Sequence, residues 1–124
     1  FRKTVSETDV YLFAGITGDF YANHVDEQYM QTTRYGRRIA HGALLVGFIS
    51  AASAKLLERL PYPAVSYGYD RIRFIRPVFL GDTVTVTCTV AAKNPEKDQV
   101  LLDVQVRNQR DELVAVATHL LKFI

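Results

Sequence analysis

The spacing of apolar residues changes once along the chain, near Ala64, and this change restricts the fold more than any other feature. Between Gly42 and Leu60 the apolar residues follow the period of a helix. They are Leu44, Leu45, Phe48, Ile49, Ala52, Leu56 and Leu57. From Ala64 onward apolar and polar residues alternate, as in strands with one buried face. The segment Thr83–Val90 shows this most clearly, because Thr alternates there with apolar residues without interruption.

We therefore expect the second half of the chain to form an antiparallel sheet. Besides Thr83–Val90, strands are predicted from Val65 to Phe74, over Val100–Val106 and over Leu113–Phe123. The turns at 94–98 and 108–112 are too short to contain crossover helices. One apolar helix followed by long strands predicts an α+β domain in which a sheet wraps a long central helix. Because small residues fill most of its other faces, we expect this helix to be enclosed.

Length and composition are those of one packed domain, covering residues 1–124. The chain begins at Phe1 without an initiator Met, which is consistent with a trimmed N-terminal element. No apolar run reaches the roughly 18–20 residues that cross a bilayer, so we expect no membrane contact. Cys88 is the only cysteine, and we expect it to be a buried strand residue of a cytoplasmic protein.

The formal charge of +2 is too close to balance to predict nucleic-acid binding. Arginines nevertheless cluster in two places. These are Arg34, Arg37 and Arg38, and then Arg71, Arg73 and Arg76. Two small basic patches suit a phosphorylated small ligand better than a polymer. Taken one at a time, most of these arginines also fit solvated surface charges.

Two short helices joined by a loop are predicted before the long helix. Ser6 is the expected N-cap of the first helix, with Asp9 three residues later in the position that completes a capping box. Asp26 is the expected N-cap of the second helix, which should run from Glu27 to about Thr33. The loop between them contains residues 19–24.

Asp19 and His24 in this loop are the candidate catalytic pair. A carboxylate and an imidazole at this spacing can hold one water between them and exchange protons with it near neutral pH. Gly42 opens the long helix, where a backbone N–H can receive a developing negative oxygen. Together these groups could add water to a polarised carbonyl compound or remove it. Taken alone, an Asp in a Gly-Asp turn such as Asp19 is more often a helix cap or turn former than a catalyst, and a lone His such as His24 is usually a hydrogen-bonded structural residue.

The other two histidines carry weaker signals. His41 precedes the long helix, and we expect it to be neutral and hydrogen-bonded, either capping the helix or beside the pocket. His119 stands in the last strand with nothing chemical beside it, which favours a structural or surface role. Three histidines without a set of carboxylate partners do not predict a metal site.

Four segments together resemble a known family. They are Phe13–Asp19, His24–Asp26, Ile39–Leu45 and Arg73–Asp82. In this order they resemble the MaoC-like, R-specific enoyl-CoA hydratases, and the resemblance covers nearly the whole chain. It implies the hot-dog fold, in which an antiparallel sheet wraps a long central helix. It also implies homodimers or higher homo-oligomers that pair their sheets edge to edge.

The resemblance implies roles for single residues. Asp19 and His24 correspond to the pair that holds the water, and Gly42 to the residue whose N–H receives the thioester oxygen. Ser50 corresponds to a serine on the central helix near the pair. The implied reaction is hydration of trans-2-enoyl-CoA to (R)-3-hydroxyacyl-CoA, or the reverse dehydration. Coenzyme A is part of the substrate, and no separate cofactor is implied.

Tyr21 and Ala22 stand where the family pattern has Asn-Pro. The spacing from Asp19 to His24 is kept, so the geometry of the pair should survive, whereas Tyr21 adds bulk and a phenolic hydroxyl. Tyr21, His41 and Ser50 are the predicted substrate-binding residues. Two other functions stay open, an acyl-CoA thioesterase and a non-catalytic acyl-thioester-binding module of the same fold.

Overall fold

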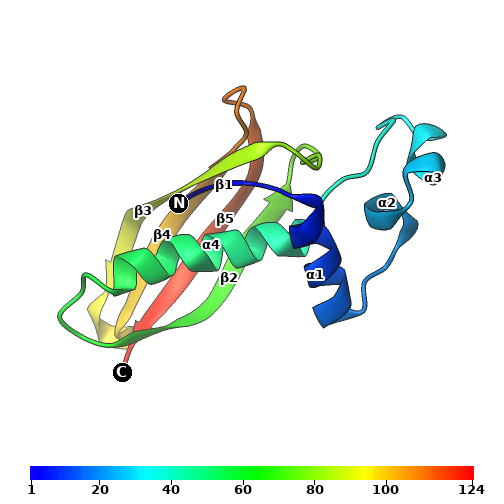
Figure 1. Ribbon diagram of the computed structural model, residues 1–124. Helices are drawn as coiled ribbons and strands as arrows, with labels where there is room; N and C mark the ends of the chain where they lie inside the picture. Colours follow the sequence, from blue (N-terminus) through cyan, green and yellow to red (C-terminus); the bar gives the residue numbers. More distant parts are fainter.

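The computed structural model describes all 124 residues. Its main feature is a five-stranded antiparallel sheet against one long helix, α4 (Gly42–Leu57), with the short helices gathered at one end (Figure 1). The strands are β1 (Arg2–Thr4), β2 (Ala64–Phe74), β3 (Thr83–Asn94), β4 (Gln99–Arg107) and β5 (Leu113–Phe123). The predicted α+β class, with one long helix on an antiparallel sheet, is confirmed.

The strand order across the sheet is β1-β3-β4-β5-β2. The strand that follows α4 in the chain therefore lies at an edge, where β2 pairs with β5 on one side only. It is a long edge strand that carries exposed apolar side chains, among them Val65, Tyr67 and Phe74. An edge of this kind leaves a row of backbone N–H and C=O groups without partners in the chain.

The hydrophobic core lies between α4 and the face of the sheet that it covers. The helix contributes four buried apolar side chains, those of Leu44, Leu45, Phe48 and Ile49. The sheet contributes Val84, Val86, Leu102, Val104, Val106, Val114, Ala115, Ala117 and Leu121. In β3 and β4 the alternating apolar positions Val84, Val86, Leu102, Val104 and Val106 face the helix, because the pleat of a strand sends every second side chain to the same side. Val65 and Tyr67, which alternate in the sequence of β2, are exposed instead.

The expectation that α4 is enclosed was wrong for this chain alone. Its side away from the sheet is exposed at Ala43, Gly47, Ser50 and Ala54. A single sheet covers only one stripe of a helix, and nothing else in the chain packs against the small residues of the opposite side.

Three short helices precede α4. Helix α1 (Glu7–Thr17) begins with the predicted capping box, in which Ser6 and Asp9 each accept a hydrogen bond from the backbone N–H of the other. Helix α2 (Ala22–Val25) occupies what was predicted to be a loop, and His24 lies within it. Helix α3 (Glu27–Gln31) is capped by Asp26 as predicted.

Several helices and strands end at other residues than predicted. Helix α3 ends at Gln31, before Thr32 and Thr33, whose hydroxyls donate to carbonyls of the preceding turn. Helix α4 ends at Leu57, three residues before the predicted end. Strand β3 continues past Val90 because a register shift there lets it keep pairing with β4. Strand β1 was not predicted, since three residues are too few to show alternation.

No helix in the structure combines the length and the apolar character that crossing a membrane requires.

Candidate active site

A sharp turn between α1 and α2 brings Asp19 and His24 together. Gly18 ends α1 with φ at 82°, a left-handed conformation that favours glycine. Asp19 Oδ1 then accepts a hydrogen bond from the Tyr21 N–H at 3.3 Å. Asp19 Oδ2 lies 4.0 Å from His24 Nε2. The two predicted catalytic groups are therefore neighbours, at a separation that lets both bond to one bridging water.

The ring of His24 is oriented by a backbone carbonyl. His24 Nδ1 lies 2.8 Å from the carbonyl oxygen of Ile39, which can only accept, so Nδ1 carries a proton. In the neutral ring Nε2 is then left without a proton and faces Asp19. The Ile39 N–H donates in turn to the Asn23 carbonyl at 3.0 Å. Because residue 39 leads into α4, these two bonds tie α2 to the start of the long helix.

A buried histidine, His41, contacts both Asp19 and His24. Its Nε2 donates to the backbone carbonyl of Asp19 at 2.9 Å, and its ring stacks on that of His24 with centroids 3.7 Å apart. The ring of Phe13 packs against His41 at 4.8 Å. His41 is only 1% exposed, and these contacts give it a positioning role, as a hydrogen-bonded residue beside the pair. Its predicted contact with substrate stays a prediction.

Burial lowers the pKa of His24 below its ordinary value of 6.5, because desolvation disfavours the imidazolium. The neighbouring His41 also lowers this pKa. The Ile39 carbonyl and the Asp19 carboxylate act in the opposite direction, but they do not outweigh burial. His24 is therefore neutral at neutral pH, and its Nε2 can accept a hydrogen bond from a water.

Gly42 supplies a free donor beside the pair. It is the first residue of α4, and its N–H has no hydrogen-bond acceptor within the chain. A cavity of about 300 Å³ opens there, lined by Gly42, His24, Phe74 and Arg76 among others. A free N–H at the positive end of a helix is suited to a developing negative oxygen. Two of the three predicted catalytic residues, His24 and Gly42, thus line one cavity, and Asp19 lies beside His24.

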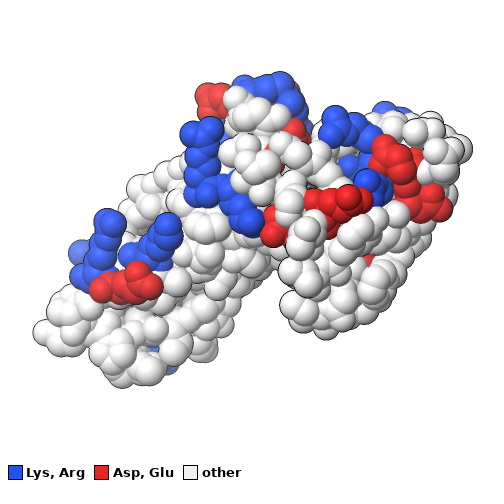
Figure 2. Space-filling model, in the orientation of Figure 1, with Lys and Arg blue, Asp and Glu red and all other residues white.

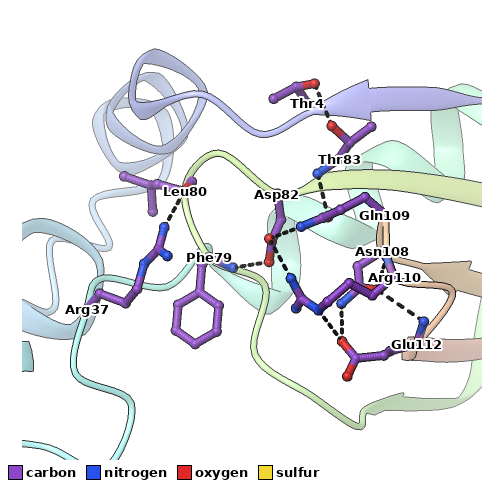
Figure 3. Close-up of polar contacts among 10 residues, drawn as sticks. All are labelled: Thr4, Arg37, Phe79, Leu80, Asp82, Thr83, Asn108, Gln109, Arg110 and Glu112. Carbon is purple, nitrogen blue, oxygen red and sulfur yellow. Dashed lines mark hydrogen bonds and ion pairs between the residues drawn. The ribbon is translucent and has the colours of Figure 1, made fainter.

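A buried carboxylate holds the loop that positions the start of α4 (Figure 3). Asp82 Oδ2 accepts from the Phe79 N–H at 2.9 Å, and Asp82 Oδ1 accepts from Gln109 Nε2 at 2.6 Å. The loop held in this way offers the Val78 carbonyl to the Ala40 N–H at 2.7 Å. Asp82 therefore acts on the site at a distance, by fixing the residues just before His41 and Gly42.

The other two predicted substrate-binding residues have exposed side chains. Tyr21 precedes α2 and is 62% exposed. Ser50 lies on the exposed side of α4, eight residues from Gly42 and so about 12 Å along the helix axis. Their roles stay predictions. Sequence reasoning missed Asn23, which lines the cavity and whose Oδ1 is buried without a hydrogen-bond partner. Its only signal is an amide directly before His24.

Asp19, His24 and His41 could each offer a metal-binding atom, and these atoms lie within 4.8 Å of one another. The geometry does not favour a metal ion. One nitrogen of each histidine already donates to a carbonyl, and the rings are stacked with only 26° between their planes. Lone pairs in two nearly parallel planes do not converge on one point, as tetrahedral coordination requires. The absence of a metal site stays a prediction.

The arginines of the first predicted basic patch are largely engaged within the chain. Arg38 forms ion pairs with Glu7 and Glu27, at 2.6 and 2.8 Å. Arg37 donates to the Leu80 carbonyl at 2.9 Å. On the face drawn in Figure 2, Lys and Arg occur in separate groups with Asp or Glu beside them. No continuous basic surface suited to a polymer appears on this face.

Comparison with known proteins decides the family. The family model described as the MaoC-like domain matches residues 2–112. The chain belongs to the MaoC-like domain family. An (R)-specific enoyl-CoA hydratase of Rhodospirillum rubrum is 52% identical over 95 residues, which are 77% of this chain and 64% of that protein. A 3-hydroxybutyryl-CoA dehydratase of Methylorubrum extorquens is 41% identical over 101 residues, 82% of this chain and 62% of that protein.

The MaoC-like domain therefore spans slightly less than two thirds of the length of these two relatives. Solved structures agree with its fold over the whole chain. An unliganded R-hydratase from Pseudomonas aeruginosa superposes with a TM-score of 0.86 at 36% identity, covering 99% of this chain and 77% of that one. An (R)-hydratase from A. caviae gives 0.90 at 27% identity, covering 100% of this chain and 92% of that one. The hot-dog fold implied by the sequence is confirmed.

The buried position of His24 predicts its titration. We expect its pKa to lie below 6.5 in the folded protein and to fall further in Asp19→Asn, which removes a charge that stabilises the imidazolium. A base with a lowered folded-state pKa contributes stability above pH 6.5, and this contribution is lost as the pH falls through the folded-state pKa. Titration of the histidine Cε1–H signals by NMR, with His24→Gln for assignment, measures both shifts. A pKa at or above 6.5 would contradict the burial argument.

Proposed function

We propose that this MaoC-like domain adds water to trans-2-enoyl-CoA thioesters to give (R)-3-hydroxyacyl-CoA, and catalyses the reverse dehydration. One observation carries the proposal. The Asp19 carboxylate lies 4.0 Å from the neutral imidazole of His24, and His24 lines the same cavity as Gly42, whose N–H is free. The two relatives, an enoyl-CoA hydratase and a 3-hydroxybutyryl-CoA dehydratase, support the same chemistry by their names.

The proposed step begins with a water held between Asp19 and His24. The water donates one hydrogen to Asp19 Oδ2 and the other to His24 Nε2, which leaves a lone pair of its oxygen free to attack carbon 3. As the new C–O bond forms, electrons move from the C=C bond toward the thioester oxygen. The N–H of Gly42 stabilises that developing negative charge.

Asp19 removes one proton from the attacking water and returns it to carbon 2, which completes the addition. The hydrogen shared with His24 Nε2 stays on the new hydroxyl, so His24 orients the water and no net proton is consumed. The reverse sequence removes water. The His24 tautomer matters here, because only an unprotonated Nε2 can accept from the water, and the Ile39 carbonyl holds that tautomer.

Removing either member of the pair should abolish the reaction without unfolding the domain. We expect Asp19→Asn and His24→Gln to hydrate crotonyl-CoA at least about 100-fold more slowly, since each loses an acid–base or orienting group. The measurement is the loss of enoyl-thioester absorbance. Asp26→Asn is the matched control, because the Asp26 side chain accepts from the Tyr29 N–H and Asn caps a helix as well as Asp does. Wild-type rates in Asp19→Asn or His24→Gln would refute the assignment.

The second part of the proposal is a homodimer that pairs through β2. Three observations support it. The outer side of β2 is unpaired over its 11 residues, apolar side chains are exposed along it, and the uncovered side of α4 bears small residues suited to close packing. Pairing β2 with its copy would satisfy the free backbone groups of the edge and continue the sheet across both chains.

A charge on this edge should separate the copies. We expect the wild-type protein to sediment at twice its chain mass of 14.0 kDa, and Tyr67→Lys to shift it toward the monomer. Lysine on an edge strand opposes strand pairing because its charge would be buried in the new interface. Thr87→Lys, at an exposed position on β3, which is not next to β2 in the sheet, is the control that should leave the mass unchanged. A monomeric wild type would overturn this part of the proposal.

A further inference from the structure

A bulge in β2 changes which side of the sheet its last residues face. Tyr69 pairs with His119 and Phe74 pairs with Ala115, so five steps along β2 match four steps along β5. The extra residue lies in the register shift between positions 70 and 73, where Arg71 adopts φ at 54°. One added residue reverses the alternation of side chains beyond it.

The reversal points Phe74 toward α4. Residues paired across two strands place their side chains on the same face. Ala115, the partner of Phe74, belongs to the core under α4, and His119 on the same face lies 2.8 Å from Ser53 of the helix. Without the bulge, the side chain of Phe74 would point to the opposite face. Because of the bulge, the aromatic ring of Phe74 lies against the start of α4.

The ring of Phe74 lies where a side chain at position 42 would begin. A Cβ built on Gly42 would be 2.5 Å from Cε2 of Phe74, 2.7 Å from Cδ2 and 2.8 Å from Cζ. Gly42 does not have the positive φ that requires glycine at Gly18. Position 42 needs glycine because of the close approach of this ring.

Phe74 and the free donor share one cavity. Both residues line it together with His24, and the Gly42 N–H has no acceptor in the chain. Phe74 is nevertheless 52% exposed, so its contact with Gly42 is not explained as part of a closed core. An apolar ring beside a hydrogen-bond donor excludes water there, and a donor in a drier site stabilises a developing charge more strongly.

We propose that Phe74 is a positioning residue for the oxyanion site, fixing the start of α4 and excluding water beside the Gly42 N–H. This inference rests on the function proposed above for Gly42. In this inference the β2 bulge directs the ring of Phe74 toward Gly42. The effects of substitutions at positions 42 and 74 are then coupled.

A double-mutant cycle tests the coupling. We expect Gly42→Ala to lower kcat about 100-fold, because its Cβ displaces the ring or the helix start, and a displacement of about 1 Å costs that much. Phe74→Ala alone should lower kcat about 10-fold with little change in KM, since the donor stays but becomes hydrated. In the double variant the Cβ has room, so kcat should recover about 10-fold over Gly42→Ala. Tyr62→Ala removes an exposed aromatic beyond the far end of α4 and should change nothing.

A second readout does not depend on activity. Gly42→Ala should lower the melting temperature, and adding Phe74→Ala should reverse that loss. Gly15→Ala, in helix α1 with nothing within 4 Å of its Cβ, should not lower it. A double variant no faster and no more stable than Gly42→Ala would overturn the inference, as would an unchanged kcat in Phe74→Ala. If the wild type hydrates no enoyl-CoA, the proposed function fails, while the melting temperatures still report whether the two positions are coupled.

Discussion

The hydrogen bond from His24 Nδ1 to the Ile39 carbonyl is the interaction on which the proposed site depends. At 2.8 Å it sets the tautomer of the ring, aims Nε2 at Asp19 and joins helix α2 to the residues that lead into α4. The acid–base pair and the oxyanion donor lie in different elements, separated in sequence by the whole of α3. This bond gives them a fixed relative position, which catalysis by positioned groups requires.

Other contacts in the domain fix the residues on either side of that hydrogen bond. His41 stacks on His24 and donates to the Asp19 carbonyl, so it restrains both members of the pair. Asp82 holds the loop whose Val78 carbonyl anchors Ala40. The polar groups of the site are thus kept in place by backbone bonds and by the buried side chains of His41 and Asp82, which is how a site stays preorganised before it binds.

The sequence predicted the parts of this account whose signals are local. Strict alternation predicted the sheet, helical spacing predicted α4, and Ser6 with Asp9 predicted the capping box. Asp19 and His24 were predicted from the chemistry of their residue types, and Gly42 from its place at the start of the long helix. The Ile39 carbonyl could not be predicted in this way, since it lies at no helix end and nothing in the sequence marks it as the partner of His24. Helix α2 was missed because four residues are too few to show a helical period.

Long-range geometry accounts for the other omissions. The bulge near Arg71 depends on how β2 pairs with β5, and the contact between Phe74 and Gly42 follows from that register. Neither is encoded by the spacing of residues within one element. The exposed side of α4 was likewise not predicted, because the sequence shows that the helix is apolar or small on all sides but not what covers each side.

The fate of the oxygen of water tests the central claim most directly. Crotonyl-CoA is incubated with the protein in water enriched in oxygen-18, and the products are analysed by mass spectrometry and for free thiol. If Asp19 and His24 direct water to carbon 3, the label appears in the hydroxyl of 3-hydroxybutyryl-CoA and the thioester stays intact. Label in a free carboxylate together with released coenzyme A would instead show attack on the carbonyl carbon, and would contradict the account.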